Sequence, residues 1–302
     1  MSSEGTNYGV VVGVDGTAGC RPAVAWAAEE AALRTLPITL LHAITPLVVS
    51  WPVGPVQASI AEWQEQQAYL AIEEARQTVQ SATGGVPMDI RTETVSSSAV
   101  STLVDASKTA SILVVGSRGA GALSRALLGS VSSGVTHHAH CPVAVIRAGE
   151  APAEPNAPVV LGIDGSPASE AATEWAFDEA ARRGVDLIAL HAWSDIAVFP
   201  ALGMDWRDRE TEGQEILAER LAGWQEQYPD VKVHRRIVCD QPARRLLEES
   251  ANAQLVVVGS HGRGGFSGML LGSVSSAVSQ AATVPVLVVR DRFPHPAQMP
   301  SS

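Results

Sequence analysis

The chain has 302 residues, of which 46% are hydrophobic and 18% charged, and its formal net charge is −11. This length allows two globular domains of ordinary size, and no apolar stretch approaches the roughly 18 residues that a membrane-spanning helix needs. A negative chain with two lysines and no basic run argues against nucleic acid and anionic membranes as partners, because binding to either depends on neutralising negative charge.

The N-terminal residues and the cysteines indicate the compartment. The first eight residues are polar and lack the apolar core of a signal peptide, so we expect a cytoplasmic protein. Cys20, Cys141 and Cys239 are scattered and form no Cys-x-x-Cys pair. We interpret them as small hydrophobic residues and not as a disulfide framework or a zinc site.

A long internal repeat organises the chain. Residues 10–16 recur at 159–165, an offset of 149, and residues 114–119 recur at 257–262, an offset of 143. Over thirty-five aligned residues around the second match, twenty are identical. The second copy has therefore lost six residues somewhere in its middle. The proline-containing segment 148–158 between the copies is typical of a linker.

Each copy, residues 1–150 and 151–302, alternates strand and helix patterns and is expected to form one domain. In the first copy the expected strands are 9–15, 38–43, 88–95, 111–116 and 142–147, and the expected helices are 21–34, 57–82, 99–108 and 130–139. The second copy repeats this order. Continuous Val, Ile and Leu runs between helices are typical of a parallel sheet covered on both faces. We therefore predict an α/β protein with two tandem, doubly wound, Rossmann-like domains, each with a five-stranded parallel sheet.

A glycine-rich loop follows the fourth expected strand of each copy. The first copy has Gly116-Ser-Arg-Gly119, nine residues, then Gly129-Ser130, and the second has Gly259-Ser-His-Gly262, nine residues, then Gly272-Ser273. The segment after each loop is predicted to be a helix with the serine as its N-cap. Glycines let backbone N–H groups converge on phosphate oxygens, and a helix N-terminus favours negative charge. We interpret both loops as anion sites, with the hydroxyls of Ser130, Ser132, Ser273 and Ser275 as further donors.

The distribution of acidic residues supports this interpretation. None occurs between Asp105 and Glu150, or between Leu255 and Arg290, and these two segments contain the loops. The basic residues within the two loops are Arg118, Arg125, His261 and Arg263. The alternative, that the glycines only form turns, is less favoured because the same spacing occurs twice.

An aspartate ends the first expected strand of each copy, Asp15 and Asp164. In a doubly wound sheet the first and fourth strands flank the point where ligands bind. We therefore expect Asp15 opposite the Gly116 loop and Asp164 opposite the Gly259 loop. A carboxylate there could bond a base or a ribose, or orient Mg²⁺; the alternative is that it caps the following helix.

The pattern Gly-x₂-Gly-x₉-Gly-Ser after strand four, with Asp ending strand one, is similar to that of the ATP-binding subclass of the universal stress protein family. The resemblance covers both copies, and it implies a strand order of 3-2-1-4-5 with one ATP per domain. In the first copy the implied binding residues are Gly13, Val14, Asp15, Ala43, Gly116, Arg118, Gly119, Gly129, Ser130, Val131 and Ser132. In the second they are Gly162, Ile163, Asp164, Ala192, Gly259, His261, Gly262, Gly272, Ser273, Val274 and Ser275. His261 in place of Arg118 predicts different affinities in the two halves.

The histidines are given structural interpretations. His137, His138 and His140 form a cluster that the second copy does not repeat, so we interpret it as a solvated helix end and not as a metal site. His42 and His191 are repeated beside the implied adenine pocket and are assigned packing roles.

The sequence contains neither a P-loop lysine motif nor an acid within the glycine loops that could position water, so efficient hydrolysis is not expected. The first hypothesis is a nucleotide-dependent regulator in stress or growth arrest, as the resemblance implies, with no catalytic residues. The alternatives are a slow Mg²⁺-dependent ATPase or nucleotidyl-transfer enzyme using Asp15 and Asp164, and a scaffold whose loops bind nothing.

The last strand of each copy, 142–147 and 285–290, is expected at a sheet edge, where exposed backbone invites pairing. The family resemblance implies that the two domains join there, and we expect the chain to form a homodimer. The sequence does not identify a protein partner.

Overall fold

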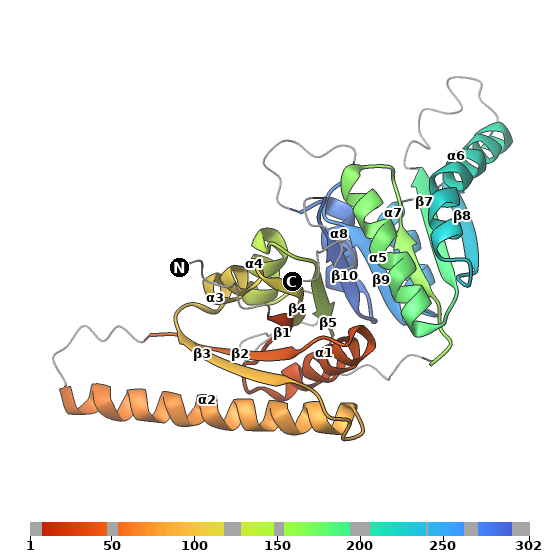
Figure 1. Ribbon diagram of the computed structural model, residues 1–302. Coiled ribbons are helices and arrows are strands. Elements are labelled where there is room, and N and C mark those ends of the chain that lie inside the picture. The colour runs from red at the N-terminus through yellow and green to blue at the C-terminus, as the bar shows by residue number, and fades with distance from the viewer. Residues whose placement is uncertain are drawn as a thin grey trace, which may run out of the picture. The chain divides into compact units, whose positions relative to one another are not determined.

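The computed structural model describes residues 8–46, 54–117, 128–147, 154–193, 206–239, 241–262 and 271–291. The chain divides into two compact units, Met1–Gly149 and Glu150–Ser302, called domain 1 and domain 2 below (Figure 1). Each has its own parallel sheet with helices on both faces.

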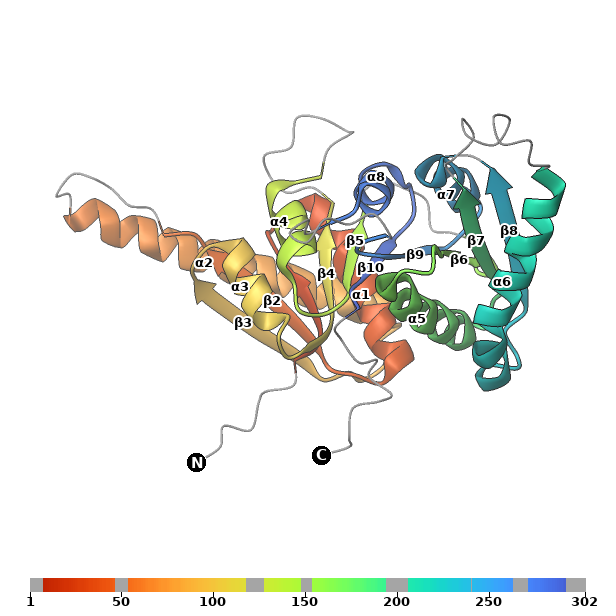
Figure 2. The same cartoon turned by 90° about the horizontal axis from the view of Figure 1, so that it is seen from above.

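Domain 1 alternates strands and helices along the chain. Its strands are β1 (Gly9–Gly13), β2 (Ile38–Ile44), β3 (Ile90–Ser96), β4 (Ala110–Gly116) and β5 (Val143–Ile146). Its helices are α1 (Arg21–Arg34), preceded by the 3₁₀ turn η1 (Ala18–Cys20), then α2 (Gly54–Ala82), α3 (Ala99–Ala106) and α4 (Ser130–His138). The strands lie in the order β3-β2-β1-β4-β5 and all neighbours are parallel, in the doubly wound arrangement expected from the sequence (Figure 1). Figure 2 shows β2, β3, β4 and β5 of this domain from above.

Domain 2 repeats this architecture. Its strands are β6 (Val159–Gly162), β7 (Leu187–Trp193), β8 (Val233–Cys239), β9 (Leu255–Gly259) and β10 (Val286–Val289). Its helices are α5 (Pro167–Arg183), α6 (Trp206–Gln227), α7 (Pro242–Ser250) and α8 (Ser273–Ala281). The strand order is β8-β7-β6-β9-β10, again with parallel neighbours, so β6 and β9 are adjacent at the centre of the sheet.

The central strands are buried because helices cover both faces of each sheet. Val10, Val11 and Val12 in β1 are fully buried, as the continuous apolar run predicted. The edge strand β3 differs, since Thr92 and Thr94 are exposed. The position of a strand in the sheet therefore explains whether its residues are buried without a break, as in β1, or alternate between partly buried and exposed, as in β3.

The six residues missing from the second copy were lost after the middle of α6. A Cβ built on Gly16 would contact Ala71, and one built on Gly165 would contact Arg220, so the offset of 149 persists into this helix. α2 continues for eleven residues beyond Ala71, whereas α6 continues for seven beyond Arg220, and the loop to the next strand shortens from seven residues to five.

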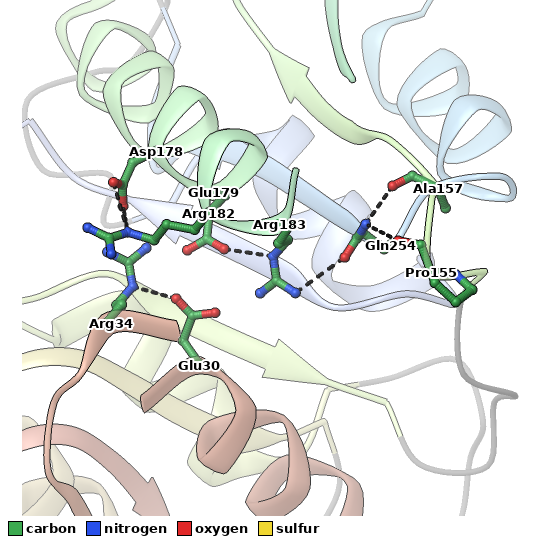
Figure 3. A network of polar contacts seen from close by, with 9 residues as sticks. All are labelled: Glu30, Arg34, Pro155, Ala157, Asp178, Glu179, Arg182, Arg183 and Gln254. Carbon is green, nitrogen blue, oxygen red and sulfur yellow. Dashed lines mark hydrogen bonds and ion pairs between the residues drawn. The ribbon is translucent and has the colours of Figure 1, made fainter. Parts of the chain in front are cut away.

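A buried polar network ties α5 to the ends of the central strands (Figure 3). The side chain of Glu179 is fully buried, and its carboxylate accepts from Arg183 Nε at 2.9 Å. Arg183 also donates to Gln254 Oε1 at 3.3 Å, and the Gln254 amide donates to the Ala157 carbonyl at 2.6 Å. These bonds satisfy buried polar groups that would otherwise destabilise the domain.

Two of the three cysteines are buried, as their interpretation as small hydrophobic residues predicts. Cys20 and Cys141 are buried free thiols, and burial raises the pKa of both above its usual value; the side chain of Cys239 lies outside the described ones. Within the described ranges, none of the helices combines the length and hydrophobicity that crossing a bilayer requires.

Candidate functional site

A cavity of about 250 Å³ lies in domain 2 at the carboxyl ends of β6 and β9. These strands are adjacent in the sheet, yet their chain connections run to opposite sides, and such a position is where open α/β sheets bind ligands. The cavity is lined by all eleven residues that the sequence analysis assigned to the second site, namely Gly162, Ile163, Asp164, Ala192, Gly259, His261, Gly262, Gly272, Ser273, Val274 and Ser275.

Five further lining residues were not predicted, namely Ser169, Leu190, Pro242, Leu246 and Val258. Leu190 and Val258 lie on predicted strands, so they could have been inferred from strand position. Ser169 and Leu246 come from helices that cover the sheet, and no pattern in the sequence indicates that they reach the crevice. Leu190, Pro242, Leu246 and Val258 add apolar side chains to the wall.

Asp164 lies opposite the glycine loop, as the sequence predicted. Its Oδ1 accepts from the backbone N–H of Ser166 at 2.9 Å, and Oδ2 faces the loop, since a Cβ built on Gly262 would lie 2.6 Å from it. The alternative, that the aspartate caps the following helix, is wrong for α5, because the N-cap of this helix is Ser166. Gly262 is therefore needed for the close approach of the loop to the carboxylate.

The helix after each loop has a different N-cap from the one predicted. The N-cap of α8 is Gly272 and that of α4 is Gly129, and neither helix has a side-chain cap, so the expected serine caps are wrong. The reason is tertiary: the Gly272 N–H donates to the Ser260 carbonyl at 2.7 Å, which draws the glycine against the end of β9. The first-turn N–H groups of an α-helix have no intrahelical carbonyl to bond. In α8 these groups belong to Ser273, Val274 and Ser275, which line the cavity.

Two serine hydroxyls that were expected to donate to a ligand donate to backbone carbonyls of the protein instead. Ser275 Oγ donates to the Ser260 carbonyl at 3.1 Å, and Ser132 Oγ donates to the Gly116 carbonyl at 2.6 Å. Both serines are buried. Because a hydroxyl has one hydrogen, these bonds leave it no donor for a phosphate in this arrangement. They fasten each helix start to the strand before the loop.

Gly259 is required by packing as well as by the loop. A Cβ at this position would lie 2.7–2.9 Å from backbone atoms of Ala168 and Ser169 at the start of α5. Real Cβ atoms do not approach a backbone so closely, so only glycine lets α5 contact the end of β9.

His261 is held at both its ring and its backbone. Its Nδ1 lies 2.8 Å from Ser260 Oγ, and its carbonyl accepts from Ser166 Oγ at 3.0 Å. Ser166 follows β6 and His261 follows β9, so the bond between Ser166 Oγ and the His261 carbonyl links the two sides of the crevice.

Domain 1 repeats the anchoring of the crevice. The Gly129 N–H donates to the Ser117 carbonyl at 2.7 Å, matching Gly272 and Ser260. Its other assigned residues Gly13, Val14, Asp15, Ala43, Gly116, Ser130, Val131 and Ser132 belong to the same strand ends and helix start, whereas Arg118 and Gly119 lie outside the described residues.

Each of the repeated histidines contacts a backbone carbonyl beside the crevice. His42 Nδ1 lies 2.8 Å from the Val14 carbonyl, and His191 Nδ1 lies 2.7 Å from the Ile163 carbonyl. Each ring thereby joins the second strand of its domain to the residue directly before the repeated aspartate, Asp15 or Asp164. In the unrepeated cluster, His137 Nδ1 lies 2.6 Å from the Ser133 carbonyl within α4.

Comparison with known proteins decides the family. Residues 9–147 and 156–290 each match the universal stress protein family. The chain belongs to this family. A universal stress protein of Mycolicibacterium smegmatis is 56% identical over 294 residues, covering 97% of this chain and 100% of its own length. Another, from Mycobacterium tuberculosis, is 51% identical over 293 residues, covering 96% of this chain and 99% of its own.

The fold is also found among solved structures. The crystal structure of a universal stress protein from Archaeoglobus fulgidus aligns with a TM-score of 0.70 at 21% identity, covering 95% of this chain and 99% of that one. At this identity the likeness concerns the fold alone. The two family matches coincide with the two domains, so this is a tandem universal stress protein.

Proposed function

We propose that this universal stress protein binds one ATP in each domain, at the carboxyl ends of β1 and β4 and of β6 and β9. The observation that carries the proposal is that the eleven residues implied by the family resemblance surround one cavity in domain 2. They come from four separate segments of the chain, so their meeting is not a consequence of sequence proximity. The same anchoring in domain 1 supports a second, equivalent site.

In the proposed complex, the phosphates lie against the loop glycines and the first turn of α8. The amides of Ser273 and Val274 are uncapped, and a helix N-terminus attracts anions. Gly262 has no side chain to separate its backbone from the ligand, and a Cβ there would fill the space beside Asp164.

The base is proposed to lie in the apolar part of the cavity, between Ile163, Ala192 and Leu246. Asp164 Oδ2 would accept a hydrogen bond from the amino group of the base or from a ribose hydroxyl. An apolar pocket with a few polar groups is typical of small-molecule sites, whose volumes are roughly 300–1,000 Å³, and this cavity is close to the lower limit.

Binding without rapid turnover fits the chemistry of the lining. Among the described lining residues Asp164 is the only acid and His261 the only base. In the proposed complex Asp164 Oδ1 accepts a backbone N–H and Oδ2 bonds the base or the ribose, so the carboxylate is not placed to orient an attacking water, on which phosphoryl transfer depends. We therefore propose a nucleotide-dependent regulator, in which ATP orders the glycine loops and changes a surface that a partner reads. A cytoplasmic location and a homodimer stay predictions.

The proposal is tested by extracting the nucleotide from the freshly purified protein and quantifying it by chromatography. We expect intact ATP at about two per chain, and a double variant Gly119→Ala with Gly262→Ala should lose it. Gly223→Ala is the matched control, because a Cβ at this helical glycine meets nothing within 4 Å. Nucleotide-free wild-type protein that also fails to bind added ATP would refute the proposal, and steady accumulation of ADP would favour the slow Mg²⁺-dependent ATPase.

A further inference from the structure

Arg220 on α6 lies against the turn that follows β6. A Cβ built on Gly165 would be 2.5 Å from Nη1, 2.7 Å from Cζ and 2.8 Å from Nη2 of this arginine. The guanidinium therefore packs flat on the glycine, which has a φ of +78°. This φ and this contact both require glycine.

The arginine is fixed from its other side by the first helix of the domain. Its Nη1 donates to Glu170 Oε1 at 2.6 Å, and the two side chains are 35% and 42% exposed. A pair so open to water adds little to folding stability. The ion pair with Glu170 thus contributes little, and the close contact of Arg220 is the one with Gly165 in the turn.

The turn under Arg220 is the one that presents Asp164 to the cavity. Gly165 directly follows Asp164, and its N–H donates to Ser169 Oγ at 3.0 Å, another residue of the cavity wall. The guanidinium therefore lies against the residue that directly follows the only acid among the described lining residues. A positive charge at this turn would offset the repulsion between the Asp164 carboxylate and a polyanionic ligand.

Domain 1 has a different arrangement at the equivalent positions. Ala71 stands where domain 2 has Arg220, and a Cβ on Gly16 would contact only its methyl group at 3.2 Å. The ion pair between the two helices is reversed and shifted, from Arg21 to Glu74 at 2.5 Å. Asp15 and Gly16 are exposed, whereas their equivalents Asp164 and Gly165 are partly covered.

We infer that Arg220 is a positioning and charge-compensating residue of the domain 2 site, which makes that site bind nucleoside triphosphates more tightly than domain 1 does. The inference rests on the proposed function. It assigns to α6 a role in ligand affinity that α2 does not share. Because the effect is electrostatic, it grows with the charge of the ligand and weakens with salt.

The test uses the full chain and two photoreactive probes, 8-azido-ATP and 8-azidoadenosine, with the labelled peptides mapped to each domain by mass spectrometry. We expect Arg220→Gln to weaken labelling of domain 2 by 8-azido-ATP about five- to tenfold at low salt, the size of a partly screened charge interaction. Labelling by the uncharged nucleoside should change less than twofold, and Arg220→Lys should restore most of the loss. Domain 1 serves as the internal control.

A transplant provides the converse test. Arg21→Glu, Ala71→Arg and Glu74→Gln together rebuild the domain 2 arrangement in domain 1, and Arg21→Glu with Glu74→Gln lacks only the new arginine. The triple variant should label domain 1 with 8-azido-ATP more strongly than the double variant.

Each result decides the inference. Unchanged domain 2 labelling in Arg220→Gln, or an equal loss for both probes, would overturn it while leaving nucleotide binding intact. If ATP does not compete with the probe in either domain of the wild-type protein, the proposed function fails as well, so the two failures are distinguishable.

Discussion

The two domains share the anchoring of the crevice but differ in how they close it. In domain 1, Thr17 donates both its N–H, at 2.9 Å, and its hydroxyl, at 2.7 Å, to Asp15 Oδ1, so the turn is satisfied within itself. In domain 2, the equivalent Ser166 donates its N–H to Asp164 but sends its hydroxyl to the His261 carbonyl across the crevice. Duplication has kept the backbone frame, and the side chains on the turn have diverged.

The same backbone can therefore carry a local turn, as Thr17 and Asp15 do in domain 1, or a hydrogen bond across the crevice. We call the bond from Ser166 to His261 in domain 2 the latch. The latch couples the two strand ends that carry the candidate ligand groups, whereas in domain 1 the Thr17 hydroxyl bonds within its own turn. Substitutions at equivalent positions should therefore affect the two domains unequally, and the following predictions run from the largest effect to the smallest.

Leu246→Ala should have the largest effect. Leu246 is 2% exposed, contacts the core of domain 2 and lines the cavity, so its truncation should cost about 2–5 kcal/mol and enlarge the site. Chemical denaturation of the full chain measures the cost. The equivalent Leu103→Ala in domain 1 should cost a similar amount, since Leu103 is 3% exposed. A loss below 1 kcal/mol in both would show that the helices over the crevice are loosely packed.

Gly259→Ala should destabilise domain 2 by about 1–3 kcal/mol, because the added methyl group forces the start of α5 away from β9. The same methyl group at Gly223 meets no neighbour and should stabilise α6 by about 0.5–1 kcal/mol through helix propensity. Thermal unfolding compares the two variants. Equal stabilities would contradict the close contact between α5 and β9.

Ser166→Ala should cost about 1 kcal/mol, since it removes both the N-cap of α5 and the bond to His261. Thr17→Ala in domain 1 should cost less than about 0.5 kcal/mol, because the exposed turn can bond to water instead. Hydrogen exchange of the amides after β9 should accelerate in the first variant only. Acceleration of the matching domain 1 amides by Thr17→Ala would remove the distinction between latch and local turn.

Cys20→Ser should have the smallest effect. Cys20 is equivalent to Ser169, whose hydroxyl already accepts from Gly165 N–H at 3.0 Å in the same setting. Serine at position 20 should therefore change the unfolding free energy by less than about 1 kcal/mol. Alkylation at pH 8 is the companion measurement: the raised pKa of the Cys20 thiol predicts slow reaction of the wild-type protein. Rapid alkylation would show that the turn opens.

The fold class, the glycine loops and the two aspartates could be predicted from local signals in the sequence, whereas the strand order and the full set of binding residues came from the family resemblance. Continuous apolar runs identify buried parallel strands, and glycines at fixed spacing identify a loop between a strand and a helix. The repeat then placed Asp164 and Gly262 on neighbouring strand ends, and strand adjacency alone brings them together. Each of these inferences uses residues that are near one another in the chain or are related by the repeat.

Other features were decided only by tertiary packing. The cap of α8 moved from Ser273 to Gly272 because the end of β9 offers a carbonyl to the glycine N–H, and the Ser275 hydroxyl is used by that same carbonyl. Arg220 lies fifty-five positions from Gly165 and reaches it only because α6 packs beside α5. Periodicity tells which face of a helix is buried, but the partner of an individual side chain depends on how distant segments meet in space.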